Sequence, residues 1–461
     1  MEPGRKAARI AWLVSLVAAA LALLLPASAL AHKRGANHRA ATKGHHHPSR
    51  HGTRHDGDRH GNPVVGTVYT TTNDPSGNGV IVLQRHRDGT LTQGATVPTG
   101  GTGIAAQPPF TFPIVDSSGS IALAKNGHLV FVVNDGDNTI TSFQAHGTQL
   151  RRASRVSSGG VLPVSLTTHG HLLYVVNEMS STISGYYFSD DGRLWSIPGS
   201  EQLISPLFPS GTAPPNTGGV AAQISFSPDG GQLIVTERGL PGTSGAIDTF
   251  EVNPNGSLTL EQALTGAGVD PNPFGFAFTN SGKLLVSNVG QVNGPFSFPA
   301  GNLPIPQIFD PAQFVGSTSS YTLSNTGTLT PISTQVASGG RGACWLVVSG
   351  DGRYAFVTNT LSSAKAVPQD IGTGIDGVSR YKVAPNGTLS LLGTTNAGTG
   401  DPTDEAVSSD GKFLYVSVPT VSPTATSHID VFGINGDGSL TTISVVDQGT
   451  LPGTISGLAA N

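Results

Sequence analysis

The sequence predicts an all-β protein, a seven-bladed β-propeller of four-stranded blades that the C-terminal strand closes onto the first blade. Three observations support this prediction: a unit that recurs seven times, a composition rich in turn-forming residues, and a spare strand near the C-terminus. The chain has 461 residues, with 61 Gly, 32 Pro and only 12% charged residues. Such a composition disfavours long helices and is typical of many short strands joined by turns.

The recurring unit has a mean length of about 58 residues, a period typical of one supersecondary unit copied around a ring or along a stack. Six copies end in a turn of the form Gly-x-Leu, as in Asp88-Gly89-Thr90-Leu91, and the second ends in the related Gly147-Thr148-Gln149-Leu150. No change of composition separates the copies, so residues 61–461 are expected to form one domain. The closing turns lie at 88–91, 147–150, 191–194, 255–258, 326–329, 386–389 and 437–440.

Within each unit the pattern predicts four strands. The first strand leads into a short hairpin turn such as Ser227-Pro228-Asp229-Gly230. The second strand is a nearly continuous apolar run, as expected where neighbouring sheets cover both faces. The expected first, innermost strands are 120–124, 164–168, 222–226, 275–279, 344–348 and 403–407. The expected second strands are 129–133, 172–176, 233–236, 284–287, 354–358 and 413–417.

Counting the strands indicates how the ring closes. The first copy begins directly at its second strand, residues 67–71, without an inner strand before it. The last copy is followed by a surplus segment, residues 453–459, which has the pattern of an inner strand. If this segment supplies the missing strand, the ring closes and no sheet edge stays exposed. An open solenoid would explain neither irregularity.

The connections between strands distinguish two faces. Turns after first and third strands share one face and are short and rich in Asp-Gly, whereas connections after second and fourth strands share the other. Several of the latter are long, namely 98–119, 204–221, 288–317 and 359–377. Long connections without secondary structure are often functional. A site is therefore expected on the long-connection face, over the central channel.

The N-terminal residues have the features of an export signal. Residues 1–31 contain early Lys and Arg, an apolar stretch and a small-x-small cleavage site at Ala29-Leu30-Ala31, and an uncleaved anchor is the alternative. We therefore expect a secreted, periplasmic or cell-envelope protein without a membrane span after cleavage, and a monomer. The acidic balance of residues 61–461, with 15 Lys and Arg against 26 Asp and Glu, disfavours nucleic acid as a partner.

Residues 32–60 are basic and contain eight of the fourteen histidines. Almost nothing in this segment is apolar, so we expect it to be disordered. His45, His46 and His47 are candidate ligands for Zn²⁺, Ni²⁺ or Cu²⁺, because neutral imidazoles bind these ions. A solvated, low-complexity linker is the alternative.

The repeated units resemble the seven-bladed lactonase family, which includes bacterial 6-phosphogluconolactonases and fungal carboxy-muconate lactonizing enzymes. The resemblance lies in residues 172–184, which contain Tyr174-Val175-Val176-Asn177, and 225–239, which contain Ser227-Pro228-Asp229-Gly230, and it covers most of 64–461. Runs such as Ala343–Val348 are similar to a secreted branch of that family. The resemblance implies a propeller acting on a small lactone or sugar acid.

The same resemblance implies two site residues. Glu178, in Tyr174-Val175-Val176-Asn177-Glu178, matches the family's glutamate, and Arg238, in Thr236-Glu237-Arg238-Gly239, matches one of its arginines. At the family's other arginine this chain has Leu162, and at its histidine it has Gly119. Lactone chemistry needs a proton-transferring group and donors for a developing oxyanion. Two functions therefore stay open: a lactonase with a reduced site, or a non-catalytic propeller that binds a glycan, protein or metal.

Other residues carry weaker expectations. No cofactor is required, although Asp401, Asp404 and Glu405, together with Asp135 and Asp137, offer oxygen ligands for Ca²⁺. Carboxylates that cap turns are the alternative for these acids. His169 and His171 are expected to be exposed on the short-turn face, and Cys344 and Trp345 to be buried.

Overall fold

The computed structural model describes eleven segments, all within residues 61–461. These residues form strands and turns, and contain no helix. The described residues therefore include no helix that could cross a membrane. The expectations for residues 1–60 lie outside the described part of the chain. The described segments are 61–104, 118–204, 221–238, 245–265, 272–290, 315–360, 377–397, 402–419, 427–446, 451–452 and 455–461.

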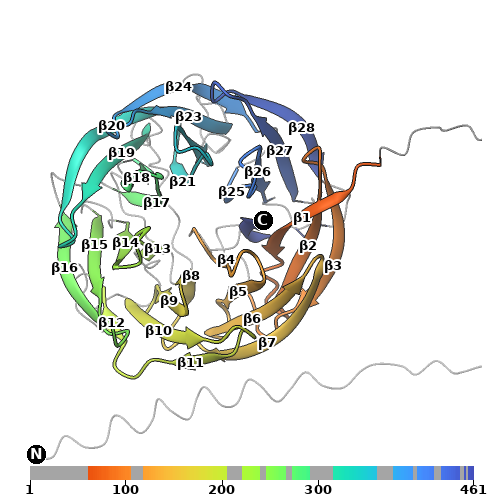
Figure 1. The fold of residues 1–461 in the computed structure, drawn as a ribbon, viewed down its shortest axis with the longest axis vertical. Helices are drawn as coiled ribbons and strands as arrows, with labels where there is room; N and C mark the ends of the chain where they lie inside the picture. The colour runs from red at the N-terminus through yellow and green to blue at the C-terminus, as the bar shows by residue number, and fades with distance from the viewer. Residues whose placement is uncertain are drawn as a thin grey trace, which may run out of the picture. The chain divides into compact units, whose positions relative to one another are not determined.

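Seven antiparallel sheets surround a central channel, as Figure 1 shows. Each sheet is one blade, listed here from the channel outward. Blade 1 is β29 (Ser456–Ala460), β1 (Val64–Thr71), β2 (Gly79–His86) and β3 (Leu91–Pro98). Blade 2 is β4 (Ile121–Ala124), β5 (Leu129–Asn134), β6 (Thr139–His146) and β7 (Gln149–Ser157). Blade 3 is β8 (Pro163–His169), β9 (Leu172–Asn177), β10 (Thr182–Phe188) and β11 (Leu194–Ser196), with β12 (Gln202–Leu203) also paired to β10.

The remaining blades repeat the plan. Blade 4 is β13 (Ala221–Phe226), β14 (Gln232–Glu237), β15 (Ala246–Val252) and β16 (Leu258–Thr265). Blade 5 is β17 (Pro273–Phe278), β18 (Lys283–Asn288), β19 (Val315–Leu323) and β20 (Leu329–Arg341). Blade 6 is β21 (Ala343–Val348), β22 (Tyr354–Asn359), β23 (Gly377–Val383) and β24 (Leu389–Asn396). Blade 7 is β25 (Glu405–Val407), β26 (Phe413–Val418), β27 (His428–Ile434) and β28 (Leu440–Val446).

Apolar clusters between neighbouring blades hold the ring together. The cluster of Tyr69 and Val130 joins blades 1 and 2, and similar clusters join every consecutive pair through blades 6 and 7. The cluster of Val68 and Tyr415 then joins blade 7 to blade 1. This closed series confirms the predicted propeller. It also explains the continuous apolar second strands: β5, for example, is buried along its whole length because blades pack on both of its faces.

The C-terminal strand completes blade 1, as predicted. In the pairing of β29 with β1, Val68 lies opposite Ala460 and Thr71 lies opposite Ser456. The Asn461 side chain accepts a hydrogen bond from the Thr67 backbone N–H at 2.8 Å. The buried Arg85 donates from Nε to the Asn461 backbone oxygen at 3.0 Å. The closing strand begins at Ser456, three residues later than the predicted 453–459, and β25 is likewise shorter than the predicted 403–407.

Candidate functional site

A repeated corner at the end of each second strand positions the candidate residues. In four blades the strand ends in an asparagine whose side-chain amide donates to the third strand or the segment beside it, at Asn134, Asn177, Asn288 and Asn359. All four are buried. These hydrogen bonds hold the backbone in place where the next residue begins, at the long-connection end of the channel. In blades 2, 3 and 4 the residues after the strand are Asp135, Glu178 and Arg238.

Glu178 and Arg238 meet, although they belong to different blades. Arg238 Nη2 lies 3.2 Å from Glu178 Oε1, close enough for a hydrogen-bonded ion pair. The side chain of Glu178 is 1% exposed and that of Arg238 is 22% exposed. The two residues that the resemblance implies thus form one site, with the guanidinium as its more accessible part.

An aromatic pair lies beneath the guanidinium. The Arg238 Cζ atom is 5.6 Å from the centre of the Phe274 ring, a distance typical of a cation–π contact. The Phe274 ring in turn packs edge-on against Trp345, with ring centres 5.0 Å apart. Cys344 is buried in the same cluster, which confirms that Cys344 and Trp345 belong to the core. The contact between Arg238 and the Phe274 ring fixes the direction of the Arg238 side chain.

Asp135 is a neighbour of Glu178 that was not predicted as part of this site. It is 5% exposed, and its Oδ2 atom has no hydrogen-bond partner among the described residues. Burial raises the pKa of Asp135 well above its usual value, and the nearby charges of Glu178 and Asp137 raise it further. Asp137 itself pairs with Arg155. The site therefore contains one ion-paired carboxylate and one buried carboxyl whose pKa is raised.

Backbone geometry fits the two residues that differ from the family pattern. Leu162 has a φ of 61°, and its N–H donates to Asn138 Oδ1 at 2.7 Å while its oxygen accepts from the Glu178 N–H at 2.8 Å. Gly119 has a φ of 82°, where a side chain is strained, and a β-carbon there would lie 3.0 Å from Ser165 Oγ. Histidine at position 119 is thus incompatible with this backbone without a shift.

Two of the acidic residues predicted to bind Ca²⁺, Asp404 and Glu405, are buried at the start of blade 7. Asp404 accepts from the N–H of Leu458 in β29 at 3.0 Å, and burial raises the pKa of Asp404 to about 7. Glu405 is buried beside Val347 of blade 6; burial and then the charge of Asp404 raise its pKa well above the usual value. Asp401 lies outside the described residues. In the segments that the structure describes, no group of three or more His, Cys, Asp or Glu side chains is arranged to hold a metal ion.

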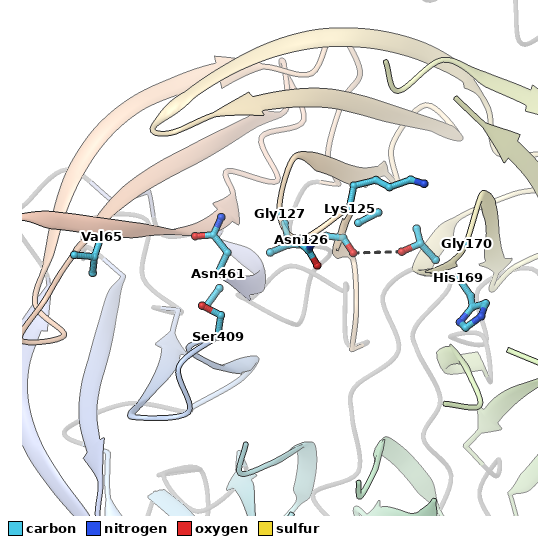
Figure 2. Close-up of a pocket in the computed structure, with 12 residues that line it drawn as sticks. Val65, Lys125, Asn126, Gly127, His169, Gly170, Ser409 and Asn461 are labelled. Carbon is cyan, nitrogen blue, oxygen red and sulfur yellow. Dashed lines mark hydrogen bonds between the residues drawn. The ribbon is translucent and has the colours of Figure 1, made fainter. Parts of the chain in front are cut away.

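A separate cavity of about 730 Å³ lies at the short-turn end, away from Glu178. Figure 2 shows the Lys125-Asn126-Gly127 turn and His169 on one side of it, and Ser409 and Asn461 on the other. His169 and His171 are exposed there, as predicted. His45, His46 and His47 lie outside the described residues.

The closed ring of seven blades defines a seven-bladed β-propeller. The sequence model described as "Lactonase, 7-bladed beta-propeller" matches residues 37–195, 164–291 and 316–456. The chain belongs to this family. A search of curated proteins gave no match.

Solved structures support the same fold. A proposed 6-phosphogluconolactonase from Bacteroides fragilis superposes with a TM-score of 0.60 at 19% identity, covering 87% of this chain and 99% of its own. A second, from Bacteroides uniformis, has a TM-score of 0.59 at 20% identity, covering 85% and 98%. A periplasmic gluconolactonase from Pseudomonas aeruginosa has a TM-score of 0.60 at 18% identity, covering 85% and 98%.

Proposed function

We propose that this protein hydrolyses a small lactone at the site formed by Glu178 and Arg238. The observation that carries the proposal is the 3.2 Å pair between these two side chains, which blades 3 and 4 bring together at the long-connection end of the channel. The buried carboxyl of Asp135 beside them adds a proton donor. Membership of the lactonase family supports lactone hydrolysis as the reaction class, and assays with a panel of lactones would identify the substrate.

The three side chains suit distinct steps of lactone hydrolysis. Glu178 accepts a proton from water as the water oxygen bonds to the lactone carbonyl carbon. Arg238 donates to the oxyanion that forms, because its guanidinium is the partly exposed group of the pair. The ring carbon–oxygen bond then breaks, and the ring oxygen takes a proton from Asp135 or from the newly protonated Glu178. The pattern of one charged and one protonated carboxyl is common in acid–base catalysis.

Hydrolysis of a panel of lactones by the purified chain tests this proposal. Glu178→Gln is expected to lower kcat/KM by about 10²-fold or more, the usual contribution of a proton-transferring side chain. Glu251→Gln, which changes an exposed carboxylate on the outer part of blade 4, serves as the matched control. Thermal unfolding of both variants separates a catalytic effect from loss of fold. Activity unchanged in Glu178→Gln, or no turnover of any lactone by the native chain, contradicts the proposal.

A second candidate function is ligand binding without turnover. It is favoured by the presence of Leu162 and Gly119 where the family resemblance implies an arginine and a histidine. Loss of one oxyanion donor typically lowers a rate by about 10²- to 10³-fold. Binding of lactones or sugar acids without hydrolysis in the panel supports this alternative.

We also propose that the protein works outside the cytoplasm, in the periplasm, in the cell envelope or as a secreted monomer. The export-signal pattern of residues 1–31 supports this location. One solved neighbour, the Pseudomonas aeruginosa gluconolactonase, is itself periplasmic. Fractionation of cells that express the full chain tests it, and recovery with the cytoplasmic marker contradicts it.

The histidine-rich segment leads to a separate prediction. If His45, His46 and His47 bind Zn²⁺, calorimetric titration of the full chain gives a heat that a variant with all three changed to Ala lacks. His169→Ala and His171→Ala, which change exposed histidines of the propeller, are the control. Equal heats from the full chain and the triple variant identify the segment as a linker.

A further inference from the structure

We infer that the site takes a neutral lactone with an apolar substituent, and that Val161, Leu162 and Met179 contact this substituent. The inference rests on the proposed function, because it assumes that the lactone ring lies at Glu178 and Arg238. It adds to the proposed function a class of substrate, namely neutral lactones rather than phosphorylated or carboxylated sugar lactones. Two independent observations carry it: an apolar rim and the pairing of nearby cations.

The apolar rim lies beside the ion pair. The segments on either side of it run together, since the N–H of Met179 donates to Val161 O at 3.1 Å and that of Glu178 to Leu162 O at 2.8 Å. Val161 and Met179 are each 46% exposed, so their apolar surface is available. Leu162 packs on its inner side against the core between blades 3 and 4. Val161 and Met179 are thus the exposed chain neighbours of Leu162 and Glu178.

The two arginines that the structure describes near Glu178 and Asp135 are each paired with an acid. Arg238 pairs with Glu178, and Arg155 pairs with Asp137. Leu162 occupies the position at which the family resemblance implies a second arginine. Recognition of a phosphate or carboxylate normally uses an arginine or lysine. A neutral ring avoids repulsion by the acids and uses Arg238 only when negative charge develops on the carbonyl oxygen.

Binding of unreactive ring analogues tests the inference without requiring turnover. Calorimetry with the intact protein compares a δ-lactam that carries a five-carbon alkyl chain with the unsubstituted δ-lactam. The alkyl lactam is expected to bind about tenfold more tightly, the lower end of what apolar contact with a substrate contributes. Met179→Gln should remove much of this preference, whereas Leu260→Gln, which changes a similarly exposed leucine on the outer strand of blade 4, should keep it.

Kinetic measurements separate this inference from the proposed function. Hydrolysis of alkyl-substituted δ-lactones in preference to 6-phosphogluconolactone supports both, and Leu162→Arg should shift the preference toward the phosphorylated substrate. An alkyl preference in binding without any hydrolysis supports the inference and contradicts the proposed function. Equal binding of the two lactams, or hydrolysis that favours the phosphorylated lactone, overturns the inference.

Discussion

Removal of residues 455–461 is expected to unfold most of the protein at room temperature. The deletion takes Ile455 and Leu458 out of the core between blades 7 and 1, and Ala459 out of the core between blades 1 and 2. Burying an Ile or Leu side chain contributes about 1.5–3 kcal/mol. The deletion also leaves the inner edge of β1 unpaired. These losses approach the total stability of a typical domain, about 5–15 kcal/mol.

A graded variant makes this prediction measurable. Leu458→Ala should lower the free energy of unfolding by about 2–5 kcal/mol, as expected for a buried leucine. Leu391→Ala, at a leucine that is 37% exposed on an outer strand, should have a much smaller effect. Urea unfolding followed by fluorescence gives both values. A truncated protein with an unchanged midpoint, or equal effects of the two leucine substitutions, contradicts the closure of the ring by β29.

Replacement of Asp404 by Asn is expected to stabilise the protein at pH 8 and to have little effect at pH 4. Burial raises the folded-state pKa of Asp404 from 3.8 to about 7, so the charged form is disfavoured in the fold. The associated stability is present below about pH 4 and is lost as the pH rises through 7. A shift of this size corresponds to at most about 4 kcal/mol at pH 8. Asn keeps one oxygen that accepts from the Leu458 N–H, but its NH2 group replaces the oxygen that accepts from the Glu405 N–H, so the gain is smaller than this bound.

The measurement is the free energy of unfolding of native and Asp404→Asn proteins at pH 4, 6 and 8. Asp437→Asn is the control: hydrogen bonds from Ser439 lower the pKa of this exposed group, so its contribution has the opposite sign and is lost only in acid. The native protein should become less stable from pH 4 to pH 8, because burial also raises the pKa of Asp430 to about 7. Equal stabilisation by Asp404→Asn at all three values, or destabilisation at pH 8, contradicts the prediction.

The fold was predictable because its signals are local and repeated. Each blade has its own turn of the Gly-x-Leu type and its own apolar second strand, and the count of strands alone required β29 to pair with β1. Boundaries were less accurate: among the described residues, the pairing of β29 with β1 begins at Ser456 rather than at residue 453. The division of the outer strand of blade 3 into β11 and β12 had no local signal.

The candidate site was only partly predictable. A motif match found Glu178 and Arg238, but the 3.2 Å contact depends on the angle between blades 3 and 4. The proximity of Asp135 had a signal that was not used. Val-Val-Asn precedes both Asp135 and Glu178, so the two residues occupy equivalent corners of adjacent blades. The left-handed backbone of Leu162 arises from hydrogen bonds to two blades, which no single segment encodes.

The pairing of β29 with β1 also has a consequence for assembly. Thr67 and Asn461 are 394 residues apart in the chain, so their contact is among the most distant in sequence that the fold contains. Folding slows as the sequence separation between contacting residues grows. A ribosome that synthesises this chain makes β1 long before it makes β29, so β1 waits for its partner until residues 456–460 have been synthesised. The arrival of β29 then converts a row of hairpins into a ring.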